Sequence, residues 1–95
     1  MGKTVAVLIR DKERQYEGLR SSLGLLLEDH KIDMFVLDHE VEMTEEYSDN
    51  MGFIDEMGGH RFSNVPANVE KHDFQRISLD ELAARLREHE VVIPF

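Results

Sequence analysis

Residues 4–9 read TVAVLI, an uninterrupted apolar run rich in β-branched side chains, and the charged residues RDKE follow it at positions 10–13. The run is too short for a stable helix, so it predicts a strand that is buried on both faces. Two more short apolar runs, Ile32–Leu37 and Val91–Phe95, have the same character, and longer stretches with helical spacing separate the three runs. Because parallel strands need long crossover connections, this alternation predicts an α/β fold.

The first two helical stretches follow the first two of these runs. Across residues 14–29, apolar side chains recur every three or four residues and form one stripe. Thr44 is placed to cap a second helix that reaches about Met57, and the glycines that follow are residues that commonly end a helix. Glycine weakens a helix interior, and we expect Gly18 and Gly24 to be there because they allow close packing against the sheet.

The remainder of the chain predicts two more strands, a loop and a third helix before the last strand. His60–Ser63 has the pattern of a short third strand and Phe74–Ile77 that of a fourth. Between them, Asn64–Asp73 predicts a loop, because it contains a proline and two asparagines. Ser78, with Glu81 three residues further on, forms a capping box that predicts the start of the third helix.

The expected architecture is a single domain over residues 1–95, a three-layer α/β/α sandwich with a mainly parallel sheet of about five strands. A parallel sheet needs cover on both faces, and a chain of 95 residues supplies few helices for that purpose. Another subunit can supply the missing cover. We therefore expect a homo-oligomer.

The composition is acidic, with a formal net charge of −9, 41% apolar residues and 33% charged residues. Nucleic acids and anionic membrane surfaces repel such a chain, so we expect neither as a partner. No apolar run approaches the ~20 residues that span a bilayer. The chain runs from Met1 directly into its first strand, which leaves no room for a signal peptide, so we expect a cytoplasmic protein. The absence of cysteine excludes disulfides, thiolate metal sites and thiol nucleophiles.

Ligands of open α/β sheets bind outside the carboxyl ends of the strands, and polar residues follow the first two predicted strands. Arg10 and Asp11 follow the first strand, where Arg10 would either meet an anionic ligand or pair with a nearby acid. The chain has no glycine-rich phosphate loop, which argues against a nucleotide. Asp38 and His39 follow the second strand and are candidates for a general base or for metal ligands. The competing interpretation of that segment is an ordinary charged loop.

Ser63 and Asn64 end the third predicted strand and start the loop after it. They are candidates for the hydroxyl and amide groups of a small-molecule pocket, or they simply form a turn. A metal site would require the fold to gather His39, His60 and His72, because the histidines show no metal-binding spacing, and we expect no metal and no other cofactor. A phosphoacceptor receiver domain has a similar rhythm of strands and helices, but it needs an aspartate where this chain has serine and asparagine.

Three segments together carry a resemblance to a known family. They are Val5–Ile9 with the leucine-rich helix that ends near residues 28–30, Phe35–Asp38, and the block from Ile54 to Phe95. In this layout, which covers most of the chain, the sequence resembles the DsrE/DsrF-like family of small α/β proteins associated with sulfur relay. The resemblance implies a five-stranded parallel sheet in a three-layer domain. It also implies assembly into dimers, trimers or hexamers, or with related DsrE-like subunits.

Active members of that family carry a cysteine after the third strand, and this cysteine receives and passes on a sulfane sulfur. The present chain has Ser63 and Asn64 there, and a serine hydroxyl cannot hold a persulfide. The resemblance therefore implies a cysteine-free member, a non-catalytic accessory or interaction protein linked to sulfur metabolism. The alternative is a small-molecule-binding protein or an enzyme that uses the polar residues at the carboxyl ends of the strands.

Overall fold

Residues 2–95 are described in a computed structural model. The expectation that the chain has no room for a signal peptide rests partly on Met1, which lies outside the described residues. The stretch TVAVLI forms β1, as the sequence predicts. The elements in chain order are β1 (Thr4–Ile9), the short 3₁₀ helix η1 (Lys12–Arg14), α1 (Gln15–Leu27), β2 (Lys31–Val36), α2 (Glu45–Glu56), β3 (His60–Ser63), α3 (Pro66–His72), β4 (Gln75–Arg76), α4 (Leu79–Leu86) and β5 (Val91–Pro94).

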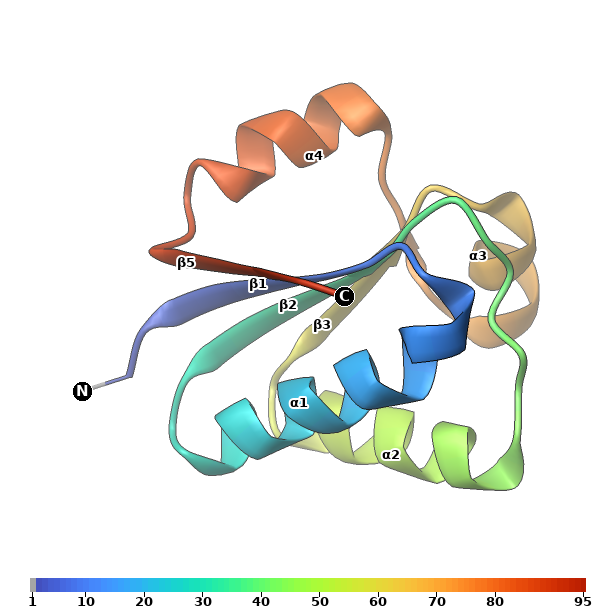
Figure 1. Ribbon diagram of the computed structural model, residues 1–95, viewed down its shortest axis with the longest axis horizontal. Coiled ribbons are helices and arrows are strands. Elements are labelled where there is room, and N and C mark those ends of the chain that lie inside the picture. Colours follow the sequence, from blue (N-terminus) through green and yellow to red (C-terminus); the bar gives the residue numbers. More distant parts are fainter. Residues whose placement is uncertain (1) are drawn as a thin grey trace.

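The five strands form one sheet in the order β4-β3-β2-β1-β5, and every neighbouring pair is parallel. Thr4 to Ile9 of β1 lie beside Lys31 to Val36 of β2 without interruption. The chain therefore moves outward from β1 to β4 and then returns through α4 to the opposite edge, where β5 pairs with β1 (Figure 1).

Helices cover both faces of this sheet, so the expected three-layer α/β/α arrangement is confirmed. α1 and α2 lie side by side on one face, and α4 lies on the other (Figure 1). Successive side chains along each strand point to opposite faces of the sheet, so the sheet has a hydrophobic core on each side. The core under α1 and α2 is the larger; the core under α4 is centred on Phe35 and Phe62, whose rings stack at 5.2 Å between centroids.

Two helix starts form as the sequence predicts. Thr44 Oγ1 accepts a hydrogen bond from the backbone N–H of Tyr47 at 3.0 Å. Ser78 Oγ accepts from the N–H of Glu81 at 3.1 Å, and a Glu81 carboxylate oxygen accepts from the N–H of Ser78 at 3.2 Å. These bonds satisfy N–H groups that otherwise have no partner in the first turn of a helix.

The two glycines of α1 have different environments. A Cβ at Gly18 would lie 2.5 Å from Ile9 Cγ1, so the close packing expected of this glycine is confirmed. A Cβ at Gly24 would meet nothing within 4 Å. The expectation that Gly24 also packs against the sheet is wrong, because it lies on the exposed side of the helix.

The predicted loop over Asn64–Asp73 is wrong, because this segment contains α3. Pro66 is the first residue of that helix, a position where its fixed φ and missing N–H are both acceptable. α3 packs at the carboxyl end of β3, and Val69 joins the core under α1 and α2. No helix within residues 2–95 is long and apolar enough to cross a membrane.

Candidate functional site

The carboxyl ends of β1, β2 and β3 bring three of the predicted site residues together. Asp38 has a left-handed backbone, with φ of 66°, and its N–H donates to Asn64 Oδ1 at 2.9 Å. Asn64 Nδ2 in turn donates to Asp38 Oδ1 at 3.0 Å. Arg10 reaches the other carboxylate oxygen of Asp38, with Nη2 at 3.4 Å. Arg10 therefore pairs with a nearby acid, which was one of its two expected roles.

Beneath this cluster, Ser63 belongs to a buried network. Its side chain is 0% exposed, and Oγ accepts from the N–H of Val65 at 3.1 Å and from Asn68 Nδ2 at 3.0 Å. A serine nucleophile needs a neighbouring base to take its proton. Neither Val65 nor Asn68 can act as one, and these are the hydrogen-bond partners of the Ser63 hydroxyl within residues 2–95. The geometry is that of a structural serine.

Asn68 is the residue of this region that sequence reasoning missed. It is 0% exposed and connects three segments: Oδ1 accepts from the N–H of Val41 at 2.8 Å, and Nδ2 donates to the carbonyl of His39 at 2.9 Å and to Ser63. Asparagine in a proline-containing segment is typical of a turn. The sequence carried no signal that this asparagine would be buried.

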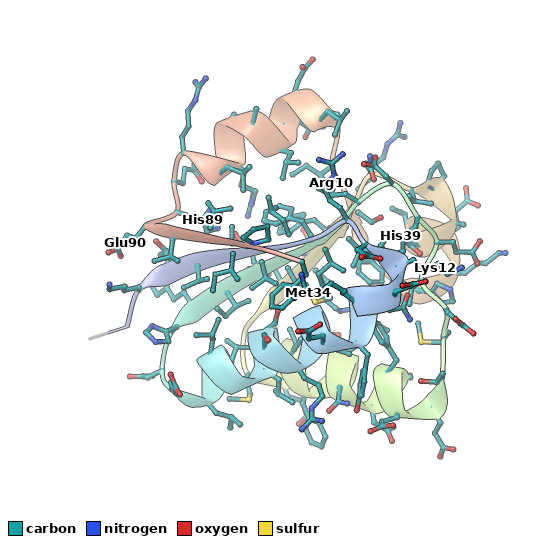
Figure 2. The ribbon with its side chains drawn as sticks, viewed as in Figure 1. Arg10, Lys12, Met34, His39, His89 and Glu90 are labelled. Carbon is teal, nitrogen blue, oxygen red and sulfur yellow. The ribbon has the colours of Figure 1, made fainter. Side chains whose placement is uncertain are left out.

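His39 lies in the same region (Figure 2), with its ring held by one bond. Nδ1 lies 3.0 Å from the carbonyl oxygen of Leu37. Because a carbonyl can only accept, Nδ1 carries a proton, and in the neutral ring Nε2 then presents a lone pair. Nε2 is buried and has no hydrogen-bond partner among the described residues. Among residues 2–95, it is the buried side-chain atom of the predicted site that lacks a hydrogen-bond partner.

Asp11 does not join the cluster. Its Oδ1 accepts from the N–H of Glu13 at 3.0 Å and caps η1, just before α1. No group of three or more histidine and carboxylate side chains within residues 2–95 is arranged to hold a metal ion, so His39, His60 and His72 are not gathered into such a site.

The predicted site is thus a set of side chains largely bonded to one another. Arg10 with Asp38 and Asn64 forms one group, and Ser63 with Asn68 forms the other. Five cavities on residues 2–95 are lined by residues outside this set. These bonds connect the segments that follow β1, β2 and β3.

A second polar cluster lies at the amino ends of the strands, opposite the predicted site, where Figure 2 labels His89. His89 Nδ1 lies 2.9 Å from the carbonyl of Arg85, and Nε2 lies 2.8 Å from an Asp33 carboxylate oxygen. Both partners accept, so the ring makes both bonds only as an imidazolium. The side chains of His89 and Asp33 are 6% and 15% exposed, so the contact between them is largely buried.

Sequence reasoning also missed this cluster, although it offered one signal. Asp33 interrupts the apolar run of β2, and a charge within a buried strand is rarely left without a partner. Arg85 Nε lies 3.4 Å from the same carboxylate, so Arg85 of α4 and His89, which follows α4, both contact Asp33 of β2. A cavity of about 500 Å³ opens beside them.

The fold and these clusters define a class of protein. It is a small α/β domain with an all-parallel five-stranded sheet, and buried polar groups at the carboxyl and amino ends of the strands bond to one another. Comparison of the chain with protein-family models, with curated proteins and with solved structures found no match. The function has to be inferred from the surface of this chain itself.

Proposed function

We propose that the protein is a non-catalytic, cytoplasmic interaction protein that assembles with copies of itself or with related DsrE-like chains. The resemblance in sequence further suggests an accessory role linked to sulfur metabolism. The assembly surface that we assign is the sheet face that carries α4, at its β5 edge.

The exposure of Val92 is the observation that carries this proposal. Val92 stands in register with Ala6, and Ala6 belongs to the core under α4, so both side chains point to that face. Ala6 is 0% exposed, whereas Val92 is 43% exposed. In the next pair on the same face, Leu8 is half-buried and Pro94 is exposed. A parallel sheet is normally covered on both faces, and a second chain packed here would complete the layer.

The state of the candidate catalytic residues also supports a non-catalytic role. The hydroxyl of Ser63 has no base beside it, and Asp38 is bonded to Arg10 and Asn64. A nucleophile or general base requires a partner that prepares it for proton transfer and an open space for substrate. Neither Ser63 nor Asp38 lines one of the cavities described above.

Sedimentation velocity at micromolar concentration tests the assembly with two matched variants. Val92→Lys places a charge on the proposed interface and should shift the wild-type assembly toward the monomer mass of 11.0 kDa. Leu27→Lys makes the same change of charge on α1, on the other side of the sheet, at a side chain that is 71% exposed. That control should assemble like the wild type.

Circular dichroism establishes that both variants are folded. A monomeric wild-type protein would overturn the proposal of self-assembly. An assembly that tolerates Val92→Lys as well as it tolerates Leu27→Lys would overturn the choice of the α4 face.

The unpartnered Nε2 of His39 favours a second function, binding of a small molecule at the carboxyl edge of the sheet. A buried acceptor of this kind is usually satisfied by water or by a ligand. Under this alternative, gently purified protein carries a bound small molecule in its native mass spectrum, and His39→Ala loses that mass while its circular dichroism spectrum stays the same. A wild-type protein without added mass contradicts it.

A further inference from the structure

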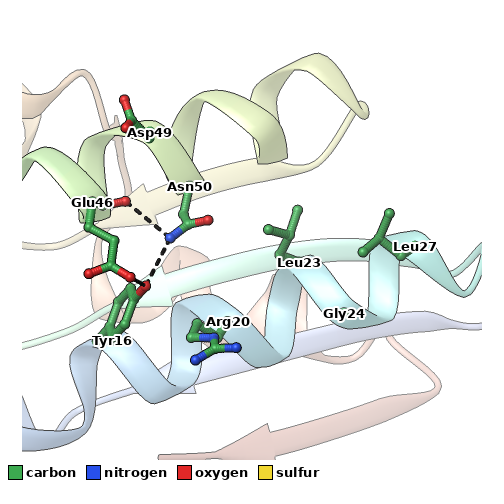
Figure 3. Close-up of a pocket in the computed structure, with 8 residues that line it drawn as sticks. All are labelled: Tyr16, Arg20, Leu23, Gly24, Leu27, Glu46, Asp49 and Asn50. Carbon is green, nitrogen blue, oxygen red and sulfur yellow. Dashed lines mark hydrogen bonds between the residues drawn. The ribbon is translucent and has the colours of Figure 1, made fainter.

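A groove of about 540 Å³ runs between α1 and α2, on the side of these helices that faces away from the sheet (Figure 3). α1 contributes Arg20, Leu23, Gly24 and Leu27 to its wall, and α2 contributes Asp49 and Asn50. Both helices connect parallel strands, so they run in the same direction and their carboxyl ends lie at the same end of the groove.

The amino-terminal end of the groove is closed by a polar cross-link between the helices. The hydroxyl of Tyr16 on α1 donates to the Glu46 carboxylate on α2, and Asn50 Nδ2 donates to the Tyr16 oxygen at 3.2 Å. The bond to Glu46 raises the pKa of the Tyr16 hydroxyl. These contacts hold α1 and α2 at a fixed separation, so the groove is formed before any partner arrives.

The other end of the groove is apolar and exposed. Leu27 is 71% exposed, and Phe53 is 52% exposed. Phe53 follows Asp49 by four residues and Asn50 by three, which places it on the same side of α2 as these two groove residues. Single exposed apolar residues are common on proteins. Leu27 in the groove wall, and Phe53 outside the wall on the same side of α2, provide anchor positions for a partner.

The charge around the groove selects the partner. The groove wall contains two acidic side chains, Glu46 and Asp49, and one basic side chain, Arg20. α2 as a whole contains five acidic residues and no basic residue, and the chain carries a net charge of −9. A nucleic acid or an anionic membrane would be repelled from this acidic surface. A positively charged partner would be attracted.

We infer that the groove binds a basic amphipathic helix of another protein. The inference rests on the proposed interaction role, but it uses the opposite side of the sheet from α4. Apolar side chains of the bound helix would lie against Leu23, Leu27 and Phe53, and its lysine or arginine side chains would face Glu46 and Asp49.

Gly24 supports a closely packed helix in this position. Glycine is unfavourable in a helix interior relative to alanine, and a Cβ at Gly24 would meet nothing within 4 Å, so internal packing does not require it. The missing side chain leaves room in the groove wall, where a docked helix can approach α1 closely.

The binding test uses a fluorescein-labelled synthetic helix of about 16 residues, long enough at about 1.5 Å per residue to span α1. Leucine occupies one face of the peptide and lysine the other positions. Fluorescence anisotropy should report saturable binding to the wild-type protein. The same peptide with glutamate in place of lysine should not bind, and equal binding of both peptides would contradict the role of charge.

Gly24→Leu is the decisive variant, because it fills the groove without changing the charge of the protein. We expect at least about tenfold weaker binding of the lysine peptide. Gly52→Leu is the matched control: it also lies in a helix with open space around it, but it does not line the groove. This control should bind like the wild type. Undiminished binding to Gly24→Leu would overturn the inference, because the basic peptide would then be held by general attraction to an acidic surface.

The mass of each variant separates this inference from the proposed self-assembly. Gly24→Leu should leave the sedimenting mass unchanged, and Val92→Lys should leave peptide binding unchanged. A wild-type protein that assembles but does not bind the lysine peptide would reject the groove and retain self-assembly. A monomeric wild-type protein that binds the peptide would reject self-assembly and retain the groove.

Discussion

Tyr47 is 1% exposed, lies in the core under α1 and α2, and its hydroxyl has no hydrogen-bond partner among residues 2–95. Desolvating a hydroxyl without replacing its bonds to water costs free energy. Tyr47→Phe removes that hydroxyl and keeps the ring. We expect the variant to be at least as stable as the wild type and up to about 1 kcal/mol more stable in urea unfolding. A loss of stability larger than that would show that the hydroxyl has a partner in solution.

Tyr47 also gives a pH dependence. Burial raises the pKa of its hydroxyl above the ordinary value, since the low-dielectric core disfavours the phenolate. The unfolded chain releases this proton near pH 10 (about 10 for free tyrosine), so stability is fully present below that pH and falls above it. Tyr47→Phe should lose less stability than the wild type between pH 9 and pH 11 (roughly one unit either side of that pKa). Equal losses would contradict the burial of this hydroxyl.

Of the polar residues at the carboxyl ends of the strands, we expect Asn68 to contribute most to the free energy of unfolding. Asn68→Ala would leave the N–H of Val41, the carbonyl of His39 and the hydroxyl of Ser63 without this partner. Each unsatisfied buried group costs about 1–3 kcal/mol, and we expect a total loss near 3 kcal/mol, measured by urea unfolding. Asn64→Ala, the same substitution at the more exposed pair with Asp38, should cost about 1 kcal/mol or less. Similar losses at both positions would contradict the central role of Asn68.

Individual residues were predictable where their role is local. Thr44 and Ser78 cap the helices that directly follow them, and capping needs no knowledge of the rest of the fold. Asn68 and the pair of His89 with Asp33 were not predictable in this way. Asn68 bonds to a residue 29 positions away, and His89 to one 56 positions away, so these contacts exist only once the sheet has formed.

At the scale of elements, α1 carries a paired prediction. Gly18→Ala should destabilise the protein by about 1–2 kcal/mol, because the new methyl group would press on Ile9, which is fully buried and has little room to move. Gly24→Ala, in the same helix but with open space around it, should stabilise the protein by up to about 1 kcal/mol. Thermal and urea unfolding of the two variants measure both changes. Shifts of the same sign would contradict the packing of α1 on β1.

The elements with strong hydrophobic patterns were predictable, and α3 was not. β1, β2 and the first two helices follow from runs and stripes of apolar side chains that match strand and helix periods. α3 has seven residues, and its fully buried side chain is the polar Asn68. Its one local indicator, proline at the first helical position, is a weaker signal than the turn-like composition of the segment around it.

The whole molecule has two unlike sides, and the two proposals belong to different ones. The α4 side leaves the apolar Val92 exposed beside the core, which suits a second copy of the chain. The α1 and α2 side combines exposed Leu27 and Phe53 with the acidic α2 helix, which suits a basic partner. The chain length was enough to predict that a second subunit covers part of the sheet. The face that is incompletely covered depends on the strand order, which hydrophobic periodicity does not determine.

Native mass spectrometry of gently purified protein tests the central claim, that this is a non-catalytic protein that assembles with itself. The account predicts a mass that is a whole multiple of the 11.0 kDa chain with no additional bound mass. A mass of one chain would contradict self-assembly. A bound small molecule would instead favour the ligand site at His39.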